Sequence, residues 1–143
     1  MTRVLFVCLG NICRSPTAEA VFRAAAPDVG ADSAGTGDWH IGKPPYPPAI
    51  RAAEARGFRM SDLRARQFTV EDFGRFDLIV AMDRQNRADI EALRPPGSDT
   101  PVCLMTDYAP GSGGDVPDPY FTGDFDGALD LIERAVAGLV RSL

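Results

Sequence analysis

The amino-acid sequence predicts an α/β fold of the doubly wound type, in which helices cover both faces of a four-stranded parallel sheet. Short apolar runs rich in valine and isoleucine are typical of strands that are buried on both faces. Segments with apolar residues at helical spacing separate these runs, and this alternation is typical of parallel sheets. A chain of 143 residues has room for one core, so we expect a single domain over residues 1–143.

The strands and helices follow in order along the chain. Strands are predicted at residues 4–7, 30–33, 78–81 and 102–104. Helices are predicted at residues 17–26, 48–56, around Phe73, 85–93 and 124–143. Pro27 ends the first helix, Gly57 closes the second, and a capping-box pattern that starts at Thr69 opens the third. Residues 106–123 are left as one long irregular segment, and such a segment in a compact domain usually has a function.

The composition excludes several classes of function. The net charge of −5 speaks against a nucleic-acid partner, and no apolar run is long enough for membrane insertion. Residues 1–3 lead directly into the first strand, so we expect no signal peptide. Three cysteines, an odd number, fit a reducing compartment, which predicts a cytoplasmic protein. A single histidine and the lack of a Cys-x-x-Cys pair predict no metal site, and we expect no cofactor.

The segment from residue 7 to residue 16 connects the first strand to the first helix. Ser15 followed by Pro16 resembles an N-cap residue and a proline at the first helical position. Residues 8–14 therefore turn from a strand end into a helix N-terminus, where backbone N–H groups and the helix dipole favour an anion. We interpret this segment as a phosphate-binding loop.

Each residue type in this loop has a chemical use. A cysteine at a helix N-terminus beside a guanidinium has a lowered pKa, which makes Cys8 a candidate nucleophile. Arg14 offers a planar fork that matches two phosphate oxygens. The Ser15 hydroxyl can donate to the Cys8 sulfur. Gly10 permits a backbone conformation closed to other residues, and Asn11 tolerates left-handed geometry and can tie the loop with its side chain.

The loop resembles the signature of the low-molecular-weight protein tyrosine phosphatases of the bacterial type, residue for residue from 7 to 16. The resemblance continues through short motifs at residues 32–36, 39–40, 65–67, 82–83 and 118–120. It implies a flavodoxin-like fold and hydrolysis of phosphotyrosine and aryl phosphates through a phosphocysteine intermediate. It also implies a monomer or weak dimer that acts on tyrosine-phosphorylated proteins, with a cognate tyrosine kinase as a candidate partner.

The same resemblance assigns the general acid and base to Asp118. From the residues alone, an aspartate between Pro117 and Pro119 is better explained as a turn former than as an acid. As an acid it would need a pKa raised by burial or by the dianionic substrate. The family's acid occupies the same Asp-Pro-Tyr setting, so the predicted catalytic residues are Cys8, Arg14 and Asp118.

The remaining site predictions concern substrate binding. By resemblance, Trp39 and Tyr120 wall a deep cleft that admits phosphotyrosine and leaves phosphoserine short of the thiolate. Phe121 is a further candidate wall residue, and His40 is expected at the rim. The predicted substrate-binding residues are Leu9, Gly10, Asn11, Ile12, Cys13, Ser15, Trp39 and Tyr120.

Cys13 has two interpretations, as a small buried residue or as a thiol that captures oxidised Cys8 in a reversible disulfide. The chain also departs from the family pattern. Leu63 stands where relatives carry a histidine that supports the loop, so this support must be missing or replaced. Tyr46 and Pro48 stand where relatives carry an acidic and a basic residue. The charges that relatives have at the substrate rim can therefore not be assumed for this chain.

Three alternative functions remain open at this point. Arsenate reductases of the same fold need redox cysteines after the third strand, and residues 82–89 contain none. Arginine phosphatases of the resembling group carry threonine where this chain has Ile12. A non-catalytic phosphopeptide-binding or redox-sensing module would not require Cys8, Arg14 and Asp118 together.

By the same family resemblance, Asp83 is expected to be a structural hydrogen-bonding residue.

Overall fold

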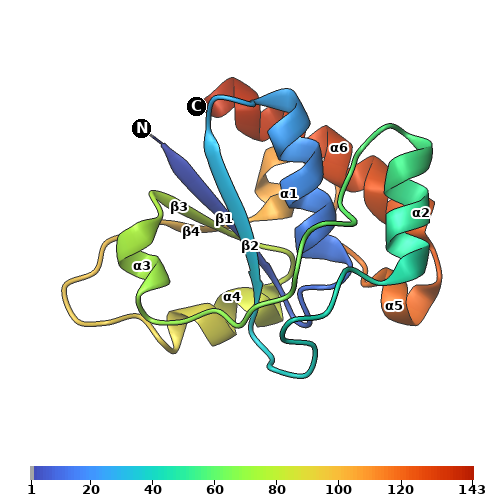
Figure 1. Ribbon diagram of the computed structural model, residues 1–143. Coiled ribbons are helices and arrows are strands. Elements are labelled where there is room, and N and C mark those ends of the chain that lie inside the picture. The colour runs from blue at the N-terminus through green and yellow to red at the C-terminus, as the bar shows by residue number, and fades with distance from the viewer. Residues whose placement is uncertain (1) are drawn as a thin grey trace.

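Four parallel strands form the centre of the computed structural model, which describes residues 2–143. They are β1 (Arg3–Cys8), β2 (Gly30–Gly35), β3 (Leu78–Ala81) and β4 (Val102–Leu104), in the order β2-β1-β3-β4 (Figure 1). This order places β1 at the point where the chain reverses its direction of travel across the sheet. The predicted doubly wound α/β fold is thus confirmed; Met1 lies outside the described residues.

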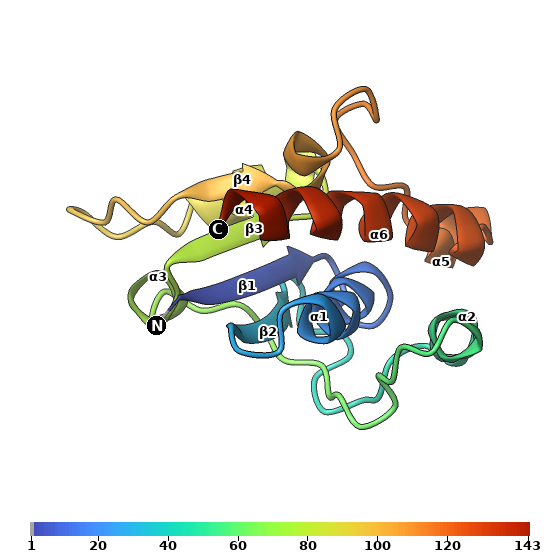
Figure 2. The same ribbon diagram turned by 90° about the horizontal axis from the view of Figure 1, so that it is seen from above.

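Helices cover both faces of this sheet. They are α1 (Arg14–Ala25), α2 (Pro47–Ala55), α3 (Asp72–Arg75), α4 (Arg84–Glu91), the 3₁₀ helix η1 (Met105–Tyr108), α5 (Pro119–Thr122) and α6 (Phe125–Ser142). Figure 1 shows α1 and α6 on one side of the sheet and α3 and α4 on the other. In Figure 2, α2 and α5 lie at the same end of the molecule, beside the start of α6.

The alternation of side chains along β1 explains this layering. Val4 and Phe6 point to the core shared with α1 and α6, where the rings of Phe6 and Phe22 are 5.4 Å apart. Leu5 and Val7 point to the opposite core beneath α3 and α4. Because both alternating sets are buried, the strand is apolar from Val4 to Cys8, which is why this part of its sequence shows no alternation of polar and apolar residues.

Two predicted boundaries are wrong. The first helix begins at Arg14 with Cys13 as its N-cap residue, so Ser15 lies inside the helix and not at its cap. Its hydroxyl is within hydrogen-bonding distance of the Cys8 sulfur instead. Residues 106–123 are also not wholly irregular, because this segment contains most of η1 and all of α5. Both helices have four residues, too few to show a helical period in the sequence.

The carboxyl ends of the four strands meet at one edge of the sheet, and four connections begin there. β1 leads into the loop before α1, and β2 ends at Gly35 directly beside that loop. A Cβ atom on Gly35 would lie 2.8 Å from the carbonyl oxygen of Leu9, so only glycine allows this approach. Ligands of doubly wound sheets bind at this edge. Among residues 2–143, no helix is long and apolar enough to cross a membrane.

Candidate active site

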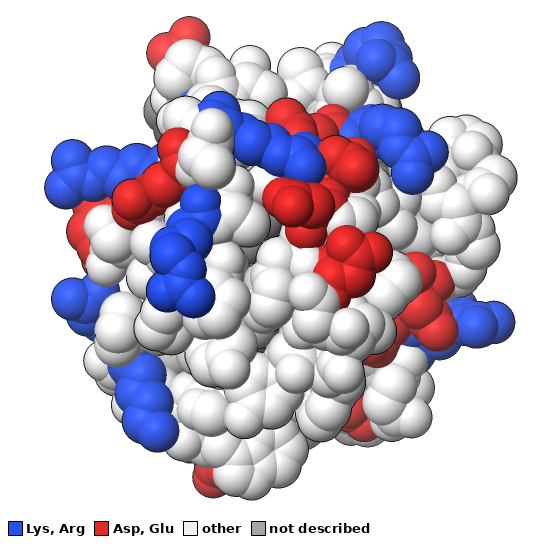
Figure 3. Space-filling model, turned by 90° about the vertical axis from the view of Figure 1, so that its right-hand side faces the viewer, with Lys and Arg blue, Asp and Glu red and all other residues white. Residues whose placement is uncertain are grey.

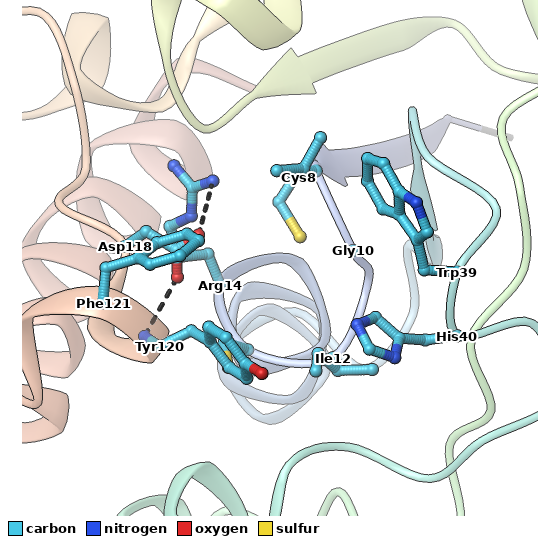
Figure 4. A pocket seen from close by; sticks show the side chains of 11 residues that line it. Cys8, Gly10, Ile12, Arg14, Trp39, His40, Asp118, Tyr120 and Phe121 are labelled. Atoms are coloured by element: carbon cyan, nitrogen blue, oxygen red, sulfur yellow. Dashed lines mark hydrogen bonds and ion pairs between the residues drawn. The ribbon is translucent and has the colours of Figure 1, made fainter.

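A pocket of about 260 Å³ opens at the carboxyl edge of the sheet (Figure 4). Its walls come from the loop after β1, the loop after β2 and the start of α5. The lining residues are Cys8, Leu9, Gly10, Ile12, Cys13, Arg14, Trp39, His40, Asp118, Tyr120 and Phe121. The three predicted catalytic residues therefore line a single pocket, although 104 residues separate Arg14 from Asp118.

Cys8 lies at the end of β1 and is 3% exposed. Its Sγ atom is 2.9 Å from the Ser15 hydroxyl oxygen and 3.2 Å from the backbone nitrogen of Asn11, which donates to it. The N-terminus of α1 begins six residues later, so its dipole acts on the same space. An ionised Cys8 sulfur would accept hydrogen bonds from both neighbours, which is the arrangement that stabilises a thiolate.

The side-chain hydrogen bonds of Asn11 hold the loop in its conformation. It is 2% exposed and has a φ of 55°, the left-handed geometry that asparagine tolerates. Its side-chain nitrogen donates to Ser15 (2.8 Å) and Ser33 (3.0 Å), and its side-chain oxygen accepts from the backbone N–H of Arg66 (2.9 Å). Asn11 and Ser15, predicted to bind substrate, thus lie beneath the pocket and not in its lining.

The expected role of Gly10 is wrong in one respect. Its φ is not positive, so the left-handed position of the loop belongs to Asn11 alone. The absence of a side chain matters for a different reason, because a Cβ on Gly10 would lie 3.0 Å from the His40 ring. His40 lines the pocket beside the loop, and its expected place at the rim remains a prediction.

Buried polar side chains on β2 and α1 connect to the loop, whereas Leu63 packs as a partly buried apolar residue. Ser33 donates to the buried carboxylate of Glu19 (2.7 Å) and accepts from Asn11, so Glu19 is connected to the loop through two hydrogen bonds. Burial raises the pKa of Glu19, although Ser33 and Arg23 act in the opposite direction. Sequence reasoning missed Glu19 and Ser33, because nothing in a helix or strand pattern marks a buried polar residue as support for a loop.

Arg14 is 3% exposed and its guanidinium is held from several sides. One nitrogen donates to Asp83 (2.7 Å) and to the carbonyl of Val116 (3.0 Å), and the other is 3.4 Å from Asp118. Burial acts to lower the pKa of Arg14, but Cys8, Asp83 and Asp118 outweigh it and raise the pKa. Arg14 therefore carries a full positive charge within an acidic molecule.

Asp118 is the N-cap residue of α5 and faces into the pocket (Figure 4). One carboxylate oxygen accepts from the backbone N–H of Tyr120 (3.1 Å), and the other is the one that approaches Arg14. The flanking prolines and the cap fix the position of this carboxylate. Its side chain is 21% exposed, so water from the open pocket can reach it.

Aromatic side chains form the mouth of the pocket. Trp39, Tyr120 and Phe121 are 64%, 50% and 75% exposed, although large apolar residues are usually buried. The rings of Tyr120 and Phe121 are 5.2 Å apart and nearly perpendicular. Phe121 is as much a part of this mouth as the two predicted aromatic residues. The rim is suited to a flat aromatic group that enters with its polar end first.

Cys13 lines the pocket as a free thiol. Burial is the main cause that raises its pKa to about 12, and the nearby Cys8 and Asp118 add to the effect. Cys13 is therefore protonated at neutral pH and does not compete with Cys8 as a nucleophile. Its capture of an oxidised Cys8 remains a prediction. Within residues 2–143, no group of three or more His, Cys, Asp or Glu side chains is placed to hold a metal ion.

Residues 3–143 match the model of the low molecular weight phosphotyrosine protein phosphatases. The chain belongs to this family. It is 41% identical to the low molecular weight protein-tyrosine-phosphatase YfkJ of Bacillus subtilis, over 100% of this chain and 96% of that protein.

Two solved structures extend the comparison. The crystal structure of Bacillus subtilis YfkJ superimposes with a TM-score of 0.93 at 40% identity, over 99% of this chain and 94% of the other. That of a Drosophila arginine phosphatase gives 0.91 at 29% identity, over 99% and 97%. The resemblance noted from the sequence is thus confirmed, and the fold is that of the phosphatase family.

Proposed function

We propose that this phosphatase hydrolyses phosphotyrosine in proteins, and aryl phosphate monoesters, with residues 1–143 acting as one catalytic domain. The single observation that carries the proposal is the meeting of Cys8, Arg14 and Asp118 in one pocket. Hydrolysis of a phosphate ester through a thiol needs a nucleophile, a cation for the phosphoryl oxygens and an acid for the leaving oxygen. Each of the three side chains fits one of these roles.

The first step transfers the phosphoryl group to the protein. The Cys8 thiolate attacks phosphorus, an S–P bond forms and the P–O bond to the phenol breaks, while Asp118 gives its proton to the departing oxygen. Arg14 and the backbone N–H groups of the loop hold the other phosphoryl oxygens. The product is a phosphocysteine and a free tyrosine side chain.

The second step returns the enzyme to its starting state. Asp118, now a carboxylate, removes a proton from a water molecule, which attacks phosphorus and breaks the S–P bond. Cys8 leaves as a thiolate, and the hydroxyl of Ser15 at 2.9 Å stabilises its returning charge. Phosphate then departs, and Asp118 again carries the proton that the next cycle requires.

Asp83 has a positioning role in this scheme. The Arg14 guanidinium contacts Asp83 at 2.7 Å and Asp118 at 3.4 Å, so the contact to Asp83 is shorter by 0.7 Å. We infer that an incoming phosphate takes over the guanidinium nitrogen near Asp118, while Asp83 keeps the fork in its orientation. Substrate binding would then free Asp118 to act on the leaving oxygen.

The experiment measures kcat/KM for a phosphotyrosyl peptide and for p-nitrophenyl phosphate. Wild type should hydrolyse both. Cys8→Ser should lower kcat/KM by a factor of at least about 10⁴, which is the scale of losing a covalent nucleophile. Cys103→Ser is the matched control, because Cys103 is a half-buried residue of β4 outside the pocket lining. Near wild-type turnover by Cys8→Ser would reject the mechanism, and turnover of phosphoarginine alone would reject the substrate.

A further inference from the structure

A second hollow lies directly beside the catalytic pocket. It encloses about 280 Å³ and is lined by Ile12, His40, Lys43, Pro44, Pro45, Tyr46, Pro47 and Tyr120. Ile12, His40 and Tyr120 also line the catalytic pocket, so the two spaces share a wall. Figure 4 shows these three side chains in a row along one side of the pocket. A ligand bound in the first space therefore lies beside the second.

Backbone hydrogen bonds and ring contacts hold the segment that builds the hollow. The backbone N–H of Tyr46 donates to the carbonyl of Ile12 (2.8 Å), and the N–H of Ala65 donates to the carbonyl of Lys43 (2.9 Å). The ring of Tyr46 contacts the Tyr120 ring at 5.1 Å and the Phe125 ring at 6.0 Å. Prolines on both sides of Tyr46 restrict the backbone further. A rigid surface of this kind binds at a small cost in conformational entropy.

The chemistry of the hollow is mainly apolar. Proline and tyrosine rings and Ile12 supply most of its lining, and Lys43 is its one residue with a permanent charge. Figure 3 shows the face that carries α2 and α5 in Figure 1, and most charged side chains gather in its upper half. The lower half of this face is mostly uncharged. It lies at the height of α5 and of residues 36–46 in Figure 1.

We infer that this second hollow is a specificity subsite for an apolar side chain two residues from the phosphotyrosine in the substrate. The inference rests on the proposed function. In an extended peptide, alternate side chains point the same way and lie roughly 6.6 Å apart, so the residue at position −2 or +2 faces the same surface as the phosphotyrosine. The shared wall of Ile12, His40 and Tyr120 makes the two spaces adjacent, so the second is the one beside which such a side chain would lie.

The test uses phosphotyrosyl peptides that carry leucine, alanine or aspartate at position −2 or +2 and alanine elsewhere. The readout is the ratio of kcat/KM between the leucine and alanine peptides, measured on one protein preparation, so general effects on catalysis cancel. We expect a ratio of about five to ten for wild type at one of the two positions, below the full effect of a closed apolar pocket. Pro44→Glu puts a charge into the hollow at an exposed position and should bring this ratio to about one.

Pro96→Glu is the matched control, because Pro96 is an equally exposed proline that lines neither space. It should keep the wild-type ratio. Equal turnover of leucine and alanine peptides by wild type at both positions would overturn the subsite while p-nitrophenyl phosphate turnover upholds the proposed function. A preference for aspartate that Lys43→Gln removes would also overturn it, in favour of an ionic site. Without turnover of p-nitrophenyl phosphate, the function and the subsite fall together.

Discussion

Asp118 should matter in proportion to how much the leaving oxygen needs a proton. The phenol of tyrosine has a pKa of about 10 and is expelled poorly without protonation, whereas an activated nitrophenol leaves with little help. Asp118→Asn should therefore slow phosphotyrosine hydrolysis strongly and activated aryl phosphates less. The measurement is kcat/KM across aryl phosphates of graded leaving-group pKa. A steeper dependence in the variant is expected, and equal slopes would move the acid to another residue of the pocket.

Arg14 should not be replaceable by lysine. Its two terminal nitrogens contact three partners, Asp83, the Val116 carbonyl and Asp118, and one ammonium group cannot reproduce this fork. Arg14→Lys keeps the charge, yet kcat should fall by a factor of about 10² or more, the scale of losing a positioned electrostatic donor. Arg64→Lys, at an exposed arginine outside the pocket, is the control. An unchanged kcat/KM in Arg14→Lys would show that backbone N–H groups suffice.

At the scale of single residues, the sequence predicted the chemical types better than their exact positions. The loop spacing indicated Cys8 and Arg14 because strand, glycine-containing turn and helix start are all local signals. The roles of Gly10 and His40 could not be predicted, since they depend on a contact between two loops that only the fold creates. The same is true of Glu19, which reaches the loop only through Ser33.

At the scale of elements, α6 contains a glycine that its packing requires. A Cβ on Gly138 would lie 2.1 Å from the carbonyl oxygen of Tyr108, where η1 crosses the helix. Gly138→Ala should therefore lower the free energy of unfolding by about 1–3 kcal/mol, although alanine ordinarily favours a helix by about 1 kcal/mol. Gly74→Ala in α3, where a Cβ meets nothing within 4 Å, is the matched control and should not destabilise. Urea unfolding measures both; equal stability of wild type and Gly138→Ala would show that η1 moves aside freely.

The contact between α1 and β2 should give stability a dependence on pH. The folded state raises the pKa of Glu19 by burial, so it holds this proton more tightly than the unfolded chain does. Wild type should then lose stability as pH rises from the ordinary glutamate range, about 4.3, through the raised folded-state pKa. Glu19→Gln keeps an acceptor for Ser33 and lacks the titration, so it should gain on wild type as pH rises. Urea unfolding over this pH range measures the free energies of unfolding of both proteins. If wild type instead became more stable than Glu19→Gln as pH rises, the Arg23 ion pair would dominate.

Elements could be predicted where their residues form a long or regular pattern. All four strands and the helices α1, α2, α4 and α6 were found, because buried strands and amphipathic helices leave periodic apolar residues in the sequence. The four-residue α3 was found from the pattern that starts at Thr69. The predicted start of α1 was wrong, because serine is a common N-cap residue, but the Ser15 hydroxyl accepts a hydrogen bond from Asn11 in the loop instead of capping the helix. The two four-residue helices near the site carry no period at all.

At the scale of the whole molecule, the parallel sheet collects segments that are far apart in sequence. A net charge of −5 gives no hint of an anion site, yet Arg14, the N-terminus of α1 and the loop amides create a local positive field at the edge of the sheet. The fold class was predictable from the order of strands and helices. The meeting of Arg14 with Asp118 was predictable only through the family resemblance, because it depends on the path of the chain after β4.

The central claim is that the phosphoryl group passes through Cys8. The most direct measurement mixes wild type with an excess of a rapidly reacting aryl phosphate, quenches with acid within the first turnover and maps the modified peptide by mass spectrometry. We expect one phosphoryl group on the peptide of residues 4–14, located on Cys8, with a burst of phenol equal to the enzyme present if the second step is slower. Turnover without any covalent phosphoryl enzyme, or with the group on another side chain, would contradict the mechanism.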